Sequence, residues 1–271
     1  MRLFPHDLRL CPLGSGSSGN ATWIGDGRVG VLVDAGVSAR AIAGRLTEAG
    51  LGDAPIDAVL VTHEHGDHVG FAATLARALA RRGRPVPFYM TAGTRDGLPP
   101  RCMPDGVEVV EPGRSLRIGH LDVEAFRIPH DTLDPVAWRV GVGDTSVAVV
   151  TDLGKPTKTV SAQLRRCAAA LLEFNHDEEM LWNGPYPWPL KQRVRGDHGH
   201  LSNRQAAELL SEGLSGRLRQ VVLGHLSEQN NTERHAEEAA RTVVEALGLD
   251  VSVRIARPRA SSEPLAVPID D

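Results

Sequence analysis

Three histidines and an aspartate lie within one short stretch, VLVTHEHGDHVG, as His63, His65, Asp67 and His68. Side chains alternate along an extended segment, so His63 and His65 are expected on the same side of it. Gly66 allows a tight turn into a following helix, which lets Asp67 and His68 point to a second position nearby. Imidazole and carboxylate ligands suit divalent ions such as zinc, manganese and iron. The stretch therefore predicts donors for two metal ions.

Further metal ligands are expected where other strands end, because one short stretch cannot complete two coordination shells. Three residues each follow an apolar run: His130 after FRIP, Asp152 after SVAVVT and His225 after RQVVLG. Proteins of the α/β class gather their active sites at such strand-to-loop junctions. Any of the three alone would be an ordinary core or loop residue. Together with residues 63–68 they predict one metal centre.

A glycine-rich segment near the start, LGSGSSGN, has the spacing G-x-G-x-x-G. A dinucleotide-binding fingerprint must open a helix, whose free N–H groups hold the pyrophosphate. Here the β-prone residues ATWI follow, and then a GDG hairpin turn, so a dehydrogenase is not indicated. We predict a flexible loop at the mouth of the metal centre; a polar connection without a ligand is the alternative. The groups that it would offer to a phosphate oxygen belong to Ser15, Ser17, Ser18 and Asn20.

Two more histidines, His176 in FNHD and His200 in DHGHLSN, each follow the expected end of an element. Either one is suited to contact a substrate phosphate or to protonate a leaving alkoxide, and ordinary surface histidines are the alternative. The segment LWNGPYPWPL carries Trp182, Tyr186 and Trp188, which could stack on nucleobases or pack against one another.

The elements that must position these side chains follow from periodicity and composition. Two β-rich blocks are each followed by helix–strand units, which predicts an α/β four-layer sandwich: two facing mixed sheets with helices outside. We expect a single domain over 1–257. Helices are predicted over 38–49, 69–82, 156–166, 202–212 and 232–247, an irregular Trp/Pro-rich segment over 180–196, and a mobile tail over 258–271.

Composition narrows the classes of protein. The 271 residues carry a net charge of −4, so this is not a globally basic nucleic-acid binder, and a phosphate partner would be met by local arginine clusters. No run approaches the ~18 apolar residues of a membrane span, and the first residues lack the apolar core of a secretory signal. The three scattered cysteines predict reduced thiols and a cytoplasmic location.

The chain resembles the metallo-β-lactamase superfamily, whose five motifs match in order over nearly all of its length. They are Asp34 in VDAG, residues 63–68, His130, Asp152 and His225. The resemblance implies that Asp34 orients a ligand histidine and that Asp152 bridges two metal ions. The common dinuclear β-lactamases carry cysteine in the motif of Asp152, so antibiotic hydrolysis is disfavoured. One ion would be held by His63, His65 and His130, and the other by Asp67, His68 and His225.

A narrower resemblance, to the YycJ/WalJ group, rests on LGSGSSGN, EFNHDEEML at 173–181, GHLSN at 199–203 and GHLSEQNN at 224–231. Members of that group are implicated as 5′-to-3′ DNA exonucleases connected with DNA repair or cell-wall homeostasis. The resemblance implies a phosphodiester hydrolase with two divalent ions (manganese, zinc or iron) and DNA as partner. Asp67 would also orient the attacking water or accept its proton.

Two other functions use the same residues. A small-molecule metallohydrolase would act on a cyclic phosphodiester, a thioester or a lactone. A narrow apolar pocket would indicate this function, whereas an arginine-lined groove would indicate a polymer substrate. A non-catalytic partner protein held together by its metals is disfavoured, because structural sites seldom need a dinuclear centre with room for water.

Overall fold

The computed structural model describes residues 7–269, and the chain divides into two compact units. The first unit contains the residues up to 127, residues 132–147 and those from 257 onward. The second unit contains residues 128–131 and 148–256. The single domain over 1–257 stays a prediction, and residues 1–6 and 270–271 lie outside the described part of the chain.

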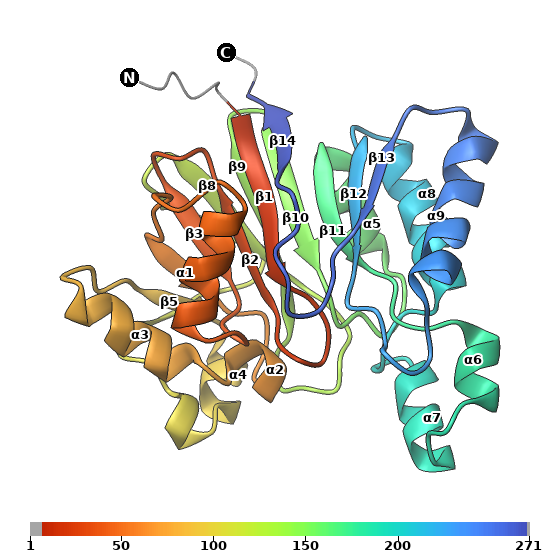
Figure 1. Ribbon diagram of the computed structural model, residues 1–271, viewed down its shortest axis with the longest axis horizontal. Coiled ribbons are helices and arrows are strands. Elements are labelled where there is room, and N and C mark those ends of the chain that lie inside the picture. The colour runs from red at the N-terminus through yellow and green to blue at the C-terminus, as the bar shows by residue number, and fades with distance from the viewer. Residues whose placement is uncertain (1–6, 270–271) are drawn as a thin grey trace. The chain divides into compact units, whose positions relative to one another are not determined.

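A seven-stranded mixed sheet belongs to the first unit, in the order β14-β1-β2-β3-β4-β5-β6 (Figure 1). The predicted hairpin is confirmed, since β2 and β3 pair antiparallel, whereas β3 to β6 run parallel. Parallel strands are covered on both faces, and β3 and β4 are accordingly buried throughout. The bounds are β1 (Asp7–Gly14), β2 (Ala21–Gly25), β3 (Gly30–Val33), β4 (Ala58–Leu60), β5 (Phe88–Met90), β6 (Val107–Val109) and β14 (Leu265–Pro268).

Helices α1 (Ala39–Glu48) and α3 (Ala72–Arg81) pack against this sheet, where Ile42 and Leu75 join Trp23 and Phe88 in one apolar core. The predicted helix over 38–49 is confirmed and is capped by Ser38. The predicted helix over 69–82 is confirmed over Ala72–Arg81, whereas Val69 ends a separate short helix. The other elements of this unit are α2 (Gly66–Val69), α4 (Ala92–Gly97) and the 3-10 turn η1 (Pro100–Cys102).

The second sheet is also mixed and has seven strands, in the order β13-β12-β11-β10-β9-β8-β7. Strands β7 to β9 are antiparallel and belong to the first unit, whereas β11 to β13 are parallel and belong to the second. The bounds are β7 (Ser115–Ile118), β8 (Leu121–Arg127), β9 (Val136–Val142), β10 (Thr145–Val150), β11 (Ala169–Glu173), β12 (Gln220–Gly224) and β13 (Ser252–Ile255).

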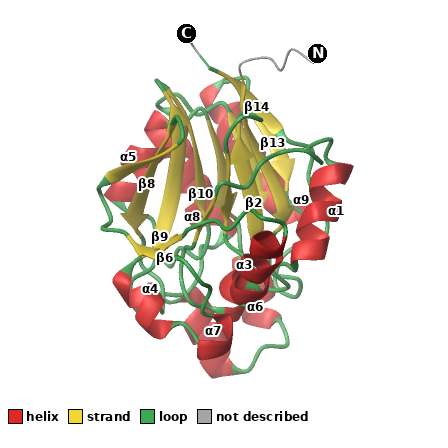
Figure 2. Ribbon diagram, turned by 90° about the vertical axis from the view of Figure 1, so that its left-hand side faces the viewer, coloured by secondary structure: helices red, strands yellow, loops and turns green. Residues whose placement is uncertain are grey.

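Five helices lie in the second unit, where α8 packs against α5 and α9. Ser202 and Gln205 form a capping box that fixes the start of α8, close to the predicted 202. Helices flank the sheets (Figure 2), so the predicted α/β class with two mixed sheets is confirmed. The helices are α5 (Lys158–Arg166), α6 (Glu178–Asn183), α7 (Trp188–Arg195), α8 (Asn203–Leu214) and α9 (Glu233–Leu247).

Two local predictions are wrong. The segment 180–196 is not irregular but largely helical, since it contains most of α6 and all of α7. Pro189 is compatible with this structure because it lies in the first turn of α7, where no backbone N–H is needed. The tail from 258 is not mobile over Leu265–Pro268, which pairs with β1 and buries Leu265 and Val267. Among residues 7–269, no helix is both long enough and apolar enough to cross a membrane.

Candidate metal centre

The first unit gathers four donors just after β4. His63 is fully buried, and its Nε2 lies 3.2 Å from Nδ1 of His65, as expected for side chains on one side of an extended segment. Oδ2 of Asp67 lies 3.5 Å from Nε2 of His68, at the start of the short helix α2. Nitrogen donors 2.0–2.1 Å from a tetrahedral zinc ion lie about 3.3 Å apart. Both pairs therefore have the spacing of ligands that share an ion.

A buried hydrogen-bond network holds these histidines in place. Oδ2 of Asp34 lies 2.7 Å from Nδ1 of His68, and the Thr62 hydroxyl donates to Asp34 and lies 3.0 Å from Nδ1 of His63. Burial raises the pKa of Asp34, although His68 and Thr62 favour its charged form. With the Nδ1 atoms of His63 and His68 occupied, Nε2 is the atom that these two rings offer to a metal. Thr62 is absent from the predicted site.

Asn20 lies at the same point, but not as a free phosphate ligand. Its amide nitrogen is 2.9 Å from Nε2 of His68 and 3.3 Å from Oδ2 of Asp67, and its oxygen accepts from Gly16 N–H. Ser15 is buried as well. Of the predicted phosphate-binding residues, only Ser17 and Ser18 are exposed, and their contact with substrate stays a prediction.

Gly36 is required where the loop after β3 crosses the metal-binding stretch. A Cβ atom there would lie 1.6 Å from the Asp67 carbonyl oxygen. Gly36→Ala is expected to lower the free energy of unfolding by about 3 kcal/mol and to weaken metal binding, because backbone must move. Thermal melts and metal titration measure both. Gly44 is an exposed position of α1 where a Cβ atom would meet nothing within 4 Å, so Gly44→Ala should instead stabilise the protein by about 0.5–1 kcal/mol. Equal losses in both variants would contradict this prediction.

The second unit brings together Asp152, Glu173, His200 and His225 as a group of possible metal donors. Oδ1 of Asp152 lies 3.6 Å from Nδ1 of His200 and also 3.6 Å from Nδ1 of His225. His130 belongs to the same unit, with Nε2 3.8 Å from Oδ1 of Asp152 and Nδ1 3.0 Å from the Gly199 carbonyl oxygen. Burial lowers the pKa of His130, which favours the neutral imidazole that a metal requires.

Glu173 is the residue of this group that the sequence reasoning misses. It ends β11 and is fully buried, and its Oε1 lies 2.8 Å from Nδ1 of His225 and 2.9 Å from Nδ1 of His200. Its Oε2 accepts from the N–H groups of Leu153 and Leu201. Burial alone would raise its pKa, but the two histidines outweigh burial and lower the pKa to about 2. The available signal was an acidic residue directly after the apolar run AALL.

Three of the predicted site residues share an unusual backbone conformation. Among the described residues, four other than glycine have φ in the left-handed region, and they include Asp34 at 64°, Asp152 at 58° and His225 at 54°. Each follows the end of a strand. Such residues are uncommon and concentrate at functional sites, where the surrounding structure holds them in place. The backbone conformation therefore indicates a functional role for three of the residues that the motifs also predict.

His176 and His200, both predicted as catalytic, lie in different surroundings. His200 is partly exposed, and its Nδ1 lies 2.9 Å from Oε1 of Glu173 and 3.6 Å from Oδ1 of Asp152. His176 is buried beside a cavity of about 520 Å³ that is lined by Trp182 and Arg195 rather than by the metal donors. Burial lowers the pKa of His176 to about 4, so it is neutral at pH 7 and a poor proton donor.

Comparison with known proteins adds to this geometry. A family model described as the beta-lactamase superfamily domain matches residues 30–226. The chain is 34% identical over 229 residues to exodeoxyribonuclease WalJ of Streptococcus pneumoniae, covering 83% of each chain. It is 31% identical over 247 residues to exodeoxyribonuclease YycJ of Bacillus anthracis, covering 90% of this chain and 92% of the relative.

A solved structure shares the fold. The metallo-beta-lactamase fold protein YhfI of Bacillus subtilis has a TM-score of 0.73 and 16% identity, covering 97% of this chain and all of that one. The fold expected from the five motifs is thereby confirmed. At this identity the likeness concerns the fold alone.

Proposed function

Because the chain belongs to the beta-lactamase superfamily, we propose that it is a dinuclear metal-dependent phosphodiester hydrolase that removes nucleotides from the 5′ ends of DNA. One observation carries the proposal: His63 with His65, and Asp67 with His68, hold donor atoms 3.2 and 3.5 Å apart, the spacing of ligands on a shared ion. The relatives named exodeoxyribonuclease, similar over most of the chain, support DNA as the substrate.

The proposed ligand set follows the motifs. His63, His65 and His130 would hold one ion, Asp67, His68 and His225 would hold the other, and Asp152 would serve both. The donor chemistry fits: imidazole and carboxylate suit manganese, zinc or iron. The partners of the Nδ1 atoms support the assignment, since Asp34 holds His68, Glu173 holds His225 and the Gly199 carbonyl holds His130.

Two bound divalent ions supply a water of lowered pKa and positive charge for the phosphate oxygens. The chain's own residues do the rest. The carboxylate of Asp67 orients the attacking water and accepts its proton. His200, whose Nδ1 is held by Glu173, presents Nε2 to the leaving oxygen and donates a proton there. His176 contributes to binding rather than to proton transfer, because it is neutral at working pH.

Metal removal tests this function. Protein dialysed against EDTA is expected to lose turnover of 5′-labelled single-stranded DNA, and manganese or zinc to restore it, because the water lacks a low pKa without the ions. The product should be labelled mononucleotide from the 5′ end only. Undiminished turnover in EDTA, or cleavage from the 3′ end, would contradict the proposal.

The same protein, treated with EDTA and then restored with manganese or zinc, also tests the small-molecule alternative. A cyclic dinucleotide, a thioester and a lactone are offered beside DNA, and turnover of one of these without DNA turnover would replace the nuclease assignment. Added salt should weaken DNA binding steeply, because phosphate contacts release counterions. A cytoplasmic location and a part in DNA repair belong to this proposal, and the three cysteines, buried and reduced, fit such a location.

A further inference from the structure

One buried asparagine lies in each of three motifs of the second unit. They are Asn175 in EFNHDEEML, Asn203 in GHLSN and Asn231 in GHLSEQNN. Each of the three side chains is at most 6% exposed. Asparagine is mostly found at protein surfaces, and a buried amide is nearly always hydrogen-bonded. Each of the three is therefore expected to hold another part of the chain.

Asn175 holds the backbone around His225. Its amide nitrogen donates to the His225 carbonyl oxygen at 2.9 Å, and its own carbonyl oxygen accepts from Ser227 N–H at 2.8 Å. The two hydrogen bonds join the loop after β11 to the loop after β12. They do so at a residue whose φ is 54°, a conformation that persists only where the surrounding structure imposes it.

Asn231 fixes the backbone of Asn175 in turn. Its amide nitrogen donates to the carbonyl oxygens of Phe174 at 2.8 Å and of Asn175 at 3.1 Å. The side-chain amides of Asn231 and Asn203 also exchange two hydrogen bonds, each 2.9 Å long. Such an exchange requires a donor and an acceptor on both side chains, which an amide offers and an ionised carboxylate does not.

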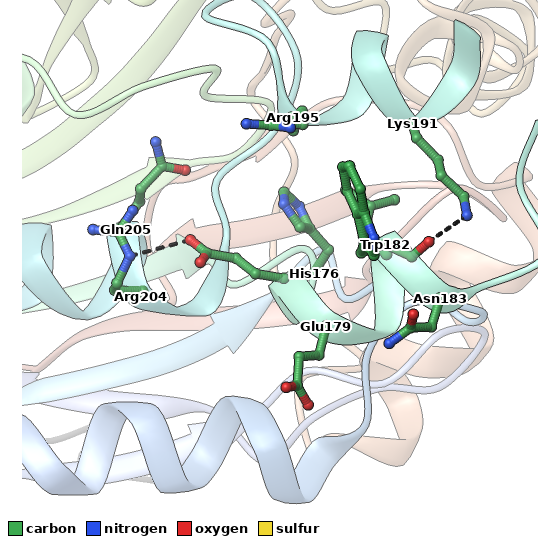
Figure 3. Close-up of a pocket in the computed structure, with 10 residues that line it drawn as sticks. His176, Glu179, Trp182, Asn183, Lys191, Arg195, Arg204 and Gln205 are labelled. Carbon is green, nitrogen blue, oxygen red and sulfur yellow. Dashed lines mark hydrogen bonds and ion pairs between the residues drawn. The ribbon is translucent and has the colours of Figure 1, made fainter. Parts of the chain in front are cut away.

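The start of α8 is part of the same network. The backbone N–H of Asn203 donates to the His176 carbonyl oxygen at 2.8 Å, and His176 forms a parallel β-bridge with Ser202. The side chain of His176 lines the cavity of Figure 3, so only its backbone belongs to the network. Leu201 N–H donates to Glu173 at 3.2 Å. The three motifs therefore meet in one hydrogen-bonded network.

We propose that Asn175 positions His225 for its metal ion and that the amide pair of Asn203 and Asn231 holds Asn175 in place. Asn175 acts on the backbone of His225, whereas Glu173 acts on Nδ1 of the same ring. The ring and the backbone of this ligand are thus fixed by two different side chains. The inference rests on the proposed function in one respect, which is that His225 is a metal ligand.

Zinc titration tests the inference without catalysis. Full-length protein is freed of metal with EDTA, dialysed and titrated with zinc in a calorimeter. Asn175→Ala removes the donor to the His225 carbonyl and is expected to weaken zinc binding about tenfold, because groups that orient metal ligands act on affinity by 10- to 100-fold. Asn203→Ala should have a smaller effect, because Asn231 keeps its hydrogen bonds to two carbonyl oxygens.

Two control variants separate positioning from loss of stability. Asn183→Ala changes an exposed asparagine at the end of α6 and should leave zinc affinity and melting temperature unchanged. Val160→Ala empties a fully buried site on α5 and should lower the melting temperature but leave zinc affinity unchanged. His225→Ala is the reference for loss of the ligand itself and should weaken zinc binding more than Asn175→Ala. Circular dichroism checks that each variant is folded.

Failure of this inference differs from failure of the function. Folded Asn175→Ala protein with wild-type zinc affinity overturns the inference, and so does an equal loss of affinity in Val160→Ala. Wild-type affinity in His225→Ala overturns the inference together with the ligand set. Wild-type protein that binds zinc but degrades no DNA overturns the nuclease proposal alone, because the titration needs no substrate. Wild-type protein that binds no zinc overturns the inference.

Discussion

Asp152→Asn is expected to reduce hydrolysis of single-stranded DNA by at least about a thousandfold while the protein stays folded. The side chain is 2% exposed, and its Oδ1 lies 3.6 Å from Nδ1 of both His200 and His225. An amide has nearly the same shape but lacks the negative charge that the proposed role of Asp152 toward two cations requires. The measurements are kcat/KM on 5′-labelled DNA and metal content per chain by mass spectrometry.

Asp197→Asn is a matched control for Asp152→Asn. Asp197 is an exposed carboxylate in the same unit, paired with Lys155, and its loss should leave turnover and metal content unchanged. An Asp152→Asn protein that keeps both metals and wild-type turnover would remove Asp152 from the proposed centre. Loss of metal together with loss of turnover is the expected pattern, because Asp152 is proposed to serve both ions.

Candidate ligands such as Asp152 and His225 can be predicted from sequence because each follows an apolar run. In α/β proteins the residues that directly follow the strands lie at the active site. Asp152 and His225 are predicted in this way. Glu173 has the same signature at the end of β11, but it lies outside the five motifs, so the motifs do not predict it. A residue that acts on other side chains, as Glu173 and Thr62 do, leaves no spacing pattern of its own.

Local composition misleads where distant contacts decide the structure. The residues from 258 onward are rich in proline, serine and acids, which predicts a mobile tail, yet Leu265 and Val267 are buried against β1. Their partner lies more than 250 residues earlier, at Leu10 and Leu8. The prolines of 180–196 predict loops, whereas Pro189 in the first turn of α7 is compatible with a helix.

Glu173→Gln is expected to weaken metal binding about 10- to 100-fold, to reduce kcat more than it raises KM, and to lower the free energy of unfolding by about 3 kcal/mol. The carboxylate accepts four hydrogen bonds, two at each oxygen. Glutamine has one acceptor and one donor group, so in either orientation its NH₂ faces two N–H donors. Metal titration, steady-state kinetics and chemical denaturation measure the three effects.

Glu178→Gln separates positioning from general loss of charge. Glu178 lies five residues further along and is half exposed, and its exposed ion pair with Arg204 contributes little to stability. It should leave metal affinity and kcat near wild type. If Glu173→Gln lowered stability but left metal affinity unchanged, Glu173 would be structural only. One carboxylate oxygen of Glu173 orients two histidines at once, the proposed ligand His225 and the proposed proton donor His200, so metal binding and proton transfer depend on the same buried charge.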